Sequence, residues 1–559
     1  MTAFNLMTGA RHPGSPAILF DRGNAADQAR SHHHRLYCMA QGDGTMEPGN
    51  PQMTSGSSDF RINSAMPHNA LIWQQYFRQG RSAGLTLQLQ VRQLIVQLVV
   101  ERKLLRGARV PSTRQLAETL DVSRNTIAHA YDLLVQDGYL CISTRQGHFV
   151  NPELVLETTV GFRGEPGSTT LSRLPQGRVS VTKPDSRTAI SRQSDWRAAP
   201  FPFVHGQIDR SLSQGPEWRE AMLLTCNAEN SAAWVSDYGV EDDPAFVEQL
   251  RRYVLPRRGI GARREEILVT LGAQNALFLI AYALCAQGTT LGTERFVYPD
   301  VRNIFRARGA RLIDLDVDEQ GLDPHQLGDE ADIIYVAPSH QNPTTVTMPL
   351  DRRIEVLEAA AERNVILIED DYDSELTFSG SPNPAIKALD TDNRVIYIGS
   401  LSKTLASGLR LGYIVAPADF IDAARSARQL MMRHPPANNQ RAAAHYIGLG
   451  HHERYMTRLA KAFAERVRVT SKALGQYLPE ARFVPPNGGS SIWLSAPDGT
   501  NMAEVEHRAA AQGVLFDAGN RFLADTTSST AYFRLGLSAI DTAKIEPGIR
   551  LLADIIRSA

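Results

Sequence analysis

Apolar residues acquire a regular spacing at about residue 85 of the chain. Residues 1–80 are rich in Gly, Pro, Ser, Asn and His and show no sustained periodicity, which is typical of a disordered tail. Downstream, apolar positions recur at helical spacing, as on one face of an amphipathic helix. These positions are Leu87, Val91, Leu94, Ile95 and Leu98. The first predicted element is therefore a helix that begins near Leu85.

Two further helices are indicated by capping residues and by the apolar faces that follow them. Ser112 lies three residues before Gln115, which fits a capping box at the start of a second helix. Ser123 is a good N-cap for a third helix. Residues 139–142 and 148–150 then read as two strands joined by a short loop. Helices in this order followed by a hairpin predict a winged helix-turn-helix.

In such a fold the N-terminal residues of the third helix enter the major groove of DNA. The candidate DNA-binding residues are Ser123, Arg124, Asn125 and Thr126, together with Arg114 in the preceding helix. Arg and Asn read base edges, whereas Ser and Thr suit phosphates. Residues 81–150 hold nine Arg or Lys and five Asp or Glu, a local charge of +4 that favours a polyanion. We predict binding to double-stranded operator DNA; a helical dimerisation module is the alternative.

The remaining chain divides into a linker and a large domain. Residues 151–197 have few apolar clusters and many Gly, Pro, Ser, Thr and Arg, which predicts a flexible linker. In residues 198–559, strand-like runs alternate with helical patterns, which implies a mostly parallel sheet. The runs lie at 311–313, 332–336, 365–368 and 395–398. Later strands near 491–494 and 532–535 indicate a smaller C-terminal α+β part.

Lys403 is the first candidate for chemistry in the large domain. It lies in a loop of small residues after a predicted buried strand, where open α/β sheets bind ligands. Ser400, Ser402 and Arg410 flank this lysine, and hydroxyl and guanidinium groups suit a phosphate. Taken alone, the segment also fits a solvated loop.

A second segment offers further contacts to a phosphate. Ala273 and Gln274 follow a strand and begin a helix, so their backbone amides can meet a phosphate at the helix N-terminus. A lysine, a phosphate cradle and the end of a parallel sheet together indicate pyridoxal 5'-phosphate, held by Lys403 as a Schiff base.

Other polar residues are placed to hold the ring of this cofactor. Asp370 ends a strand and would keep the pyridine nitrogen protonated. Tyr372 and Asn342 would hydrogen-bond the phenolic oxygen, and Tyr298 would stack on the ring. Arg534 would bind the carboxylate of an effector as a fork. Each residue also has a structural reading, as a solvated loop, a core aromatic or a surface residue, but their order along the chain favours one site.

Composition restricts the class of protein. A chain of 559 residues should hold more than one domain, and its net charge of -1 gives no global sign of a polyanion partner. The 4 cysteines are far apart, which argues against a disulfide framework or a zinc site, and no metal site is predicted. Without a bilayer-spanning run or a signal peptide, we expect a cytoplasmic protein with no membrane partner.

Both halves of the chain resemble known families. Residues 111–117, 122–126 and 137–140 resemble the GntR-type winged helix. Residues 197–555 resemble the fold-type I, class I/II aminotransferases, most specifically at Ser400-Leu401-Ser402-Lys403 and Gly408-Leu409-Arg410. The order of winged helix, linker and aminotransferase-like domain is similar to the MocR family of transcription regulators. The acidic stretch 369–375 looks like that family's aspartate strand.

The resemblance implies a fold and a role for each site residue. It implies a multidomain protein with an α+β winged helix-turn-helix, an α/β fold-type I domain and a small C-terminal α+β subdomain. Lys403 would form the aldimine, and Tyr238 would reach the cofactor phosphate of the neighbouring subunit. The expected assembly is a domain-swapped, head-to-tail homodimer.

Three functions remain open at this stage. The first is a pyridoxal phosphate-dependent transcription regulator, in which an amine or amino acid effector displaces Lys403 by external aldimine formation and so changes DNA binding. The second is an active aminotransferase, complete or limited to one half-reaction, with an accessory DNA-binding domain. The third is a plain repressor whose aminotransferase-like fold has lost its cofactor. We rank them in this order.

Overall fold

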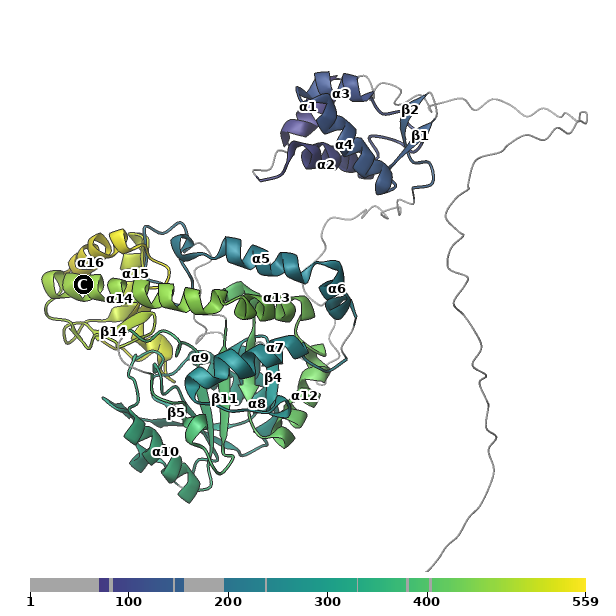
Figure 1. The fold of residues 1–559 in the computed structure, drawn as a ribbon. Helices are drawn as coiled ribbons and strands as arrows, with labels where there is room; N and C mark the ends of the chain where they lie inside the picture. The colour runs from purple at the N-terminus through teal and green to yellow at the C-terminus, as the bar shows by residue number, and fades with distance from the viewer. Residues whose placement is uncertain are drawn as a thin grey trace, which may run out of the picture. The chain divides into compact units, whose positions relative to one another are not determined.

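The computed structural model describes residues 70–79, 84–143, 146–154, 196–236, 239–328, 330–378, 382–401 and 405–558 (Figure 1). The chain divides into two compact units, residues 1–172 and 173–559. The predicted linker lies largely outside the described residues, as does the predicted tail up to residue 69. Three predicted site residues also lie outside them, namely Tyr238, Ser402 and Lys403.

The first unit contains the predicted helices and hairpin. Its elements are α1 (Ala70–Gln79), α2 (Leu87–Val100), α3 (Thr113–Leu120), α4 (Arg124–Gln136), β1 (Leu140–Ser143) and β2 (Gly147–Val150). Both predicted N-cap serines are confirmed: Ser112 Oγ accepts from the Gln115 amide at 3.2 Å, which is one half of the predicted capping box, and Ser123 Oγ accepts from the Thr126 amide at 3.1 Å. β1 and β2 pair in antiparallel fashion, which completes the winged helix.

Helix α1 was not predicted, because it lies within the stretch expected to be a disordered tail. Its Trp73 and Phe77 are only 1% and 5% exposed and belong to the same apolar core as α2, α3 and α4. The apolar residues of this short helix are too few to give a sustained period, and packing on the other helices is what stabilises it. The apolar core of the first unit therefore includes residues of α1, upstream of the predicted start at Leu85.

A mixed sheet forms the centre of the second unit. Its strands, in spatial order, are β4 (Ile267–Thr270), β12 (Gly412–Val415), β11 (Val395–Ser400), β10 (Ile366–Asp371), β9 (Ile333–Val336), β5 (Thr290–Glu294) and β6 (Arg311–Leu315). The predicted, mostly parallel arrangement is confirmed, with β12 running opposite to its neighbours β11 and β4. The carboxyl ends of the parallel strands therefore share one edge of the sheet.

Helices cover both faces of this sheet (Figure 1). On β11, Ile396 and Ile398 pack with α8, α9 and α12, whereas Val395 and Tyr397 point to the opposite face. This alternation follows from the two-residue period of a strand, and buried runs on both faces are typical of parallel sheets. The covering helices are α7 (Pro244–Gln249), α8 (Ala273–Leu284), α9 (Pro299–Ala307), α10 (Leu350–Glu362), α12 (Ala418–Met432) and α13 (Ala437–Gly448).

The predicted C-terminal α+β part packs around a second sheet. Its elements are α14 (His451–Tyr477), β13 (Arg482–Phe483), β14 (Ser491–Ser495), α15 (Met502–Ala511), β16 (Asp517–Ala518), β17 (Tyr532–Gly536) and α16 (Thr542–Arg557). The start of the unit also belongs here, since β3 (Phe201–Pro202) pairs with β15 (Val514–Leu515). Phe203 is buried in this C-terminal core.

The remaining short elements are α5 (Gly215–Thr225), α6 (Ala228–Val235), α11 (Ile386–Leu389), β7 (Val317–Asp318) and β8 (Gly321–Leu322). In the described part of the chain, no helix combines the length and the apolar composition that crossing a bilayer would require.

Candidate functional site

Three strand ends meet at the place where a phosphate was predicted to bind. Gly272 lies between β4 and α8 with a φ of +86°. Gly412 begins β12, and a Cβ at this position would lie 2.7 Å from Gly272 Cα and 2.9 Å from the Gly399 carbonyl oxygen. Only a residue without a side chain permits this approach. The ends of β4 and β11 are thereby held against the start of β12.

The groups around this meeting point are those predicted to hold the phosphate. Ala273 and Gln274 are the first residues of α8, and the first N–H groups of a helix have no partner within it. Ser400 is the last residue of β11 and pairs with the first residue of β12. Arg410 has a φ of +52° and donates through Nη2 to the Leu271 carbonyl oxygen at 2.7 Å. The structure brings these four residues to one edge of the sheet.

Asp370 lies on the neighbouring strand, β10, and its side chain is buried. Its Oδ2 accepts a hydrogen bond of 2.7 Å from the hydroxyl of Tyr335 on β9. The register pairs Tyr335 with Ile368, so Asp370 lies two residues farther along the same face. An anion fixed at the carboxyl edge of the sheet suits the nitrogen of a pyridinium ring.

A second buried carboxyl group, Glu294, lies at the end of β5. Gln341 Nε2 donates to its Oε2 at 3.0 Å and to the Phe296 carbonyl oxygen at 2.6 Å. Burial raises the pKa of Glu294 to about 8, and the negative charge of Asp370 adds to this rise. Because Gln341 precedes Asn342, the contact also fixes the loop that carries Asn342.

Tyr298 and Gln274 are joined through Asp300. The Tyr298 hydroxyl donates to Asp300 Oδ2 at 2.7 Å, and Gln274 Nε2 donates to the same oxygen at 3.0 Å. The aromatic residue predicted to stack on the ring is thus tied to a residue predicted to hold the phosphate.

Arg534, the predicted effector-binding residue, has a buried side chain with two polar partners. Its Nη1 donates to Asn342 Oδ1 at 2.8 Å, while Nε and Nη2 donate to Asp517 Oδ2 at 3.1 and 2.8 Å. Its guanidinium carbon lies 4.7 Å from the centre of the Phe522 ring. Arg534 therefore contacts Asn342 directly, and a carboxylate that bound this guanidinium would share it with Asp517.

Tyr372 is buried beside these groups. Its ring meets that of His205 edge to face, with centroids 6.0 Å apart. Burial raises the pKa of Tyr372 well above its usual value, the Asp373 carboxylate adds to the rise, and the Arg534 charge opposes it. The hydroxyl consequently stays protonated and can donate a hydrogen bond to an oxyanion.

Several residues of this site were not predicted from the sequence. They are Tyr335, Glu294, Gln341, Asp300 and Asp517, each of which contacts a predicted site residue or lies beside one. Tyr335 can be identified as a partner of Asp370 only when the register between β9 and β10 is known. Asp517 and Arg534 come together because β16 pairs with β17.

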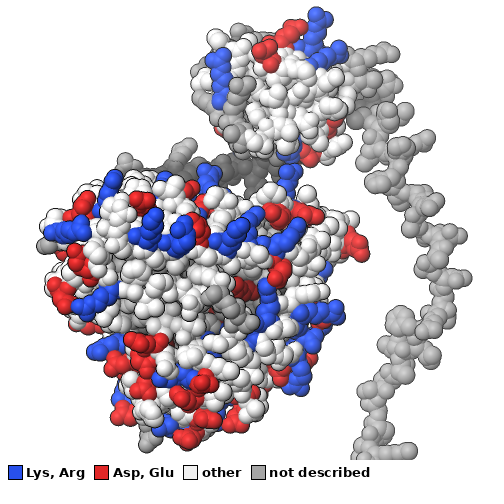
Figure 2. Space-filling view, turned by 60° about the vertical axis from the view of Figure 1, so that its left-hand side comes forward, with Lys and Arg blue, Asp and Glu red and all other residues white. Residues whose placement is uncertain are grey.

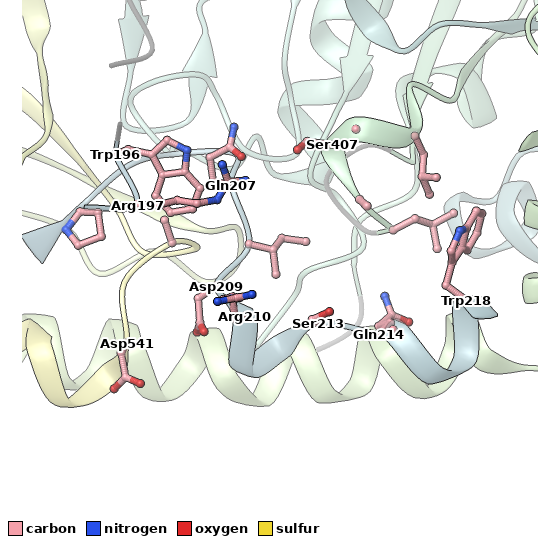
Figure 3. Close-up of a pocket in the computed structure, with 18 of the residues that line it drawn as sticks. Trp196, Arg197, Gln207, Asp209, Arg210, Ser213, Gln214, Trp218, Ser407 and Asp541 are labelled. Atoms are coloured by element: carbon pink, nitrogen blue, oxygen red, sulfur yellow. The ribbon is translucent and has the colours of Figure 1, made fainter. Parts of the chain in front are cut away.

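A cavity of about 900 Å³ opens beside residues 405–409, which follow the predicted lysine loop. Figure 3 shows Trp196, Arg197 and Gln207 grouped on one side of it, Asp209, Ser213 and Gln214 above a long helix, and Trp218 opposite. None of the predicted cofactor residues that the structure describes lines this cavity.

In the first unit, the residues predicted to contact DNA lie at the starts of α3 and α4. Arg124 and Asn125 are exposed on the first turn of α4. The Ser123 and Thr126 hydroxyls are 2.8 Å apart, so both take part in the cap as well as facing solvent. Arg114 is exposed and forms an ion pair of 3.2 Å with Glu118.

Comparison with known proteins agrees with both units. Residues 87–150 match the family of bacterial regulatory proteins, gntR family, and residues 209–552 match aminotransferase class I and II. The HTH-type transcriptional regulator TauR of Rhodobacter capsulatus is 36% identical over 472 residues, which cover 84% of this chain and 97% of TauR. The chain belongs to this family of GntR-type regulators with an aminotransferase-like domain.

Further relatives support each half of this regulator family's layout. The probable rhizopine catabolism regulatory protein MocR of Rhizobium meliloti is 30% identical over 79% of this chain and 88% of its own length. The solved structure of kynurenine aminotransferase from Pyrococcus horikoshii is 28% identical over 65% of this chain and 92% of its own, with a TM-score of 0.61. MocR-type regulators thus share the whole layout, and aminotransferases share the large domain.

The described residues fit pyridoxal 5'-phosphate, the cofactor of this fold. The close contact at Gly412 brings the N-terminus of α8 and Arg410 to one place, where they would hold the phosphate, and Asp370 is a buried carboxyl that would pair with the ring nitrogen. The cofactor supplies an aldehyde that a primary amine can capture and a ring that withdraws electrons. The protein is a pyridoxal phosphate-dependent, DNA-binding transcription regulator.

Proposed function

We propose that the aminotransferase-like domain senses an amine or amino acid effector through external aldimine formation at Lys403, and that this event changes the affinity of the winged helix for operator DNA. One observation carries the proposal. The described residues that are predicted to hold the cofactor lie at one edge of the sheet, in a chain whose other unit is a GntR-type winged helix. A cofactor site in a regulator has a direct use as a receptor for amines.

The surroundings of Arg534 favour an effector that carries a carboxylate as well as an amine. Its guanidinium contacts Asn342, which would hold the cofactor's phenolic oxygen, so an effector bound to Arg534 lies next to the ring. A guanidinium and a carboxylate form paired hydrogen bonds in a fixed geometry. Asp517 already takes two of the guanidinium donors and would compete with the effector. An amino acid or comparable zwitterion is therefore the proposed class.

The proposal includes the remaining contacts predicted from the sequence. Ser402 would bind the phosphate, and Tyr238 would reach the phosphate of the partner in a domain-swapped, head-to-tail homodimer. DNA would be read by Arg124 and Asn125 and held by the residues around them. The proposed functional divisions are a DNA-binding domain over residues 81–150, a linker over 151–197 and a cofactor domain over 198–559. Helix α1 packs on the DNA-binding domain.

Replacement of the lysine tests this function. We expect Lys403→Ala to abolish the response of DNA binding to effector while leaving operator binding itself in place. The measurement is fluorescence anisotropy of labelled operator DNA with and without each of a panel of L-amino acids and their decarboxylated amines. Lys544→Ala, which removes an exposed lysine of α16, is the matched control and should respond like the unmodified protein. An unchanged effector response in Lys403→Ala would refute the sensing mechanism.

An active aminotransferase is the second candidate, and the assembly of Asp370, Asn342 and Arg534 favours it as well. Catalysis also requires a lysine that shuttles protons after it has been displaced. Steady-state turnover of an amino acid with a keto acid would establish this activity, whereas a single half-reaction would not.

A further inference from the structure

Helix α14 presents a row of cations on its exposed face. One face of this 27-residue helix is buried, with Tyr455, Met456, Leu459 and Phe463 packed inside. The opposite face has charged side chains at alternating intervals of four and three residues, which keeps them in line along a helix. They are Arg454, Arg458, Lys461, Glu465, Arg468 and Lys472. Figure 2 shows Lys and Arg in a row across the large unit, at the height at which α14 crosses it in Figure 1.

Most of these cations lack a close carboxylate within the described residues. Lys461 and Lys472 have none within 4.0 Å, and the nearest to Arg458 is Glu217, at 4.0 Å. Arg454 contacts the ring of His451. Arg468 alone is closely paired, with Glu465 at 2.6 Å. Five cations and one carboxylate thus give this row a charge of +4, in a chain whose net charge is -1.

This arrangement does not serve the stability of α14. Like charges three or four residues apart repel each other on a helix surface, by a few tenths of a kcal/mol per pair. Cations near a helix N-terminus also face the positive end of the helix dipole. Arg454 lies in the first turn of α14, which begins at His451 and also contains Glu453. An anionic partner along the row would offset both costs.

The dimensions of the row match a nucleic-acid backbone. From Arg454 to Lys472 the helix rises about 27 Å, at about 1.5 Å per residue. Duplex DNA repeats a phosphate about every 3.4 Å along each strand, so the row spans about eight base pairs. We propose that the basic row of α14 binds the phosphate backbone of operator DNA outside the bases contacted by the winged helix. The large domain would then be a second, sequence-independent DNA-binding surface of this regulator.

The test compares two charge-matched variants of the full, cofactor-loaded chain. The row variant carries Arg454→Gln, Arg458→Gln, Lys461→Gln and Lys472→Gln. The control carries Arg264→Gln, Arg295→Gln, Arg306→Gln and Arg311→Gln, which removes as many exposed cations of the same unit away from α14. Affinity is measured at several salt concentrations for a short duplex limited to the winged-helix sites and for a duplex with long flanks.

We expect the row variant to bind the long duplex more weakly, on the order of tenfold, with a salt dependence shallower by about 0.9 for each phosphate that the row no longer neutralises. Its affinity for the short duplex should equal that of the unmodified protein, which also shows that the winged helix remains folded and active. The proposal is overturned if the row variant retains full affinity and salt dependence on the long duplex. An equal weakening in the control variant, or an equal weakening on the short duplex, overturns it as well.

Discussion

Two buried carboxyl groups near the predicted cofactor residues, Glu294 and Asp371, show how neighbouring side chains set the pKa of a carboxyl. The carboxyl of Glu294 has no guanidinium partner among the described residues, since Arg302 donates only to the backbone carbonyl of Glu294, and burial raises the pKa of this carboxyl to about 8. Burial acts on Asp371 in the same sense, but Arg258 at 2.7 Å and the hydroxyl of Tyr397 outweigh it and lower the pKa of Asp371. Burial therefore favours the protonated form of Glu294, whereas the paired partners of Asp371 favour its ionised form.

The raised pKa of Glu294 has a measurable consequence for stability. Between the ordinary pKa of 4.5 and the folded pKa of about 8, the folded protein holds a proton that the unfolded chain has released. The free energy of unfolding therefore contains a contribution from Glu294 that is fully present below pH 4.5 and is lost as the pH rises to about 8, by at most about 1.4 kcal/mol per pH unit. Glu294→Gln should flatten this decline.

The measurement is urea denaturation followed by circular dichroism between about pH 5 and pH 8. Glu265→Gln, at an exposed position of the same unit, is the control and should keep the slope of the unmodified protein. A Glu294→Gln protein with an unchanged slope would show that this carboxyl is ionised in the fold.

Strand patterns in the sequence pointed to Asp370 and Arg534, which lie on β10 and β17, and to Asn342, which lies in the loop that follows β9, while the roles of all three stay predictions. It did not predict Tyr335 or Asp517, because their roles depend on which strands pair and in what register. Nor does a sequence pattern reveal the protonation of Glu294, which follows from burial. Lys403 remains a prediction from the sequence.

At the scale of elements, a strand of reversed direction shapes the edge of the sheet at which the predicted cofactor residues lie. β12 runs between β4 and β11, two strands distant in sequence, and brings their ends together. The sequence predicted the strands on either side but not this one, because a four-residue apolar run gives no sign of its direction. The glycine at its start is the residue that permits the close packing.

Gly412→Ala should destabilise the large unit by about 1–3 kcal/mol, the usual cost of forcing atoms into a packed site. The added Cβ would lie 2.7 Å from Gly272 Cα, so the backbone must move, and with it the N-terminus of α8, which is predicted to hold the phosphate. We expect weaker retention of pyridoxal 5'-phosphate, measured by the visible absorption of the protein after dialysis. Gly408→Ala is the matched control, since a Cβ there meets nothing within 4 Å.

Equal retention in both variants would show that the packing of β12 against the β4–α8 turn does not shape the phosphate site. Release of the cofactor from the Gly408→Ala variant alone would contradict the role assigned to Gly412 in shaping the phosphate site.

At the scale of the whole molecule, one chain binds both DNA and pyridoxal 5'-phosphate. The winged helix and the cofactor domain are separate compact units, each with its own core. The sequence predicted both units because each carries its own periodic pattern and motifs. It could not predict how one unit affects the other, because that depends on free-energy differences between states of the whole protein and not on local patterns.

Thermodynamic linkage makes this coupling testable without knowledge of its structural route. If an amino acid changes the affinity of the protein for operator DNA by some factor, the DNA must change the affinity for that amino acid by the same factor. Typical couplings of this kind are about 5- to 150-fold. We therefore expect a spectral titration of the cofactor with an active L-amino acid to shift by an equal factor when saturating operator DNA is present. A duplex without the operator sequence should give a smaller shift. If the amino acid alters DNA binding while operator leaves the titration unmoved, the effector acts at a site other than the cofactor.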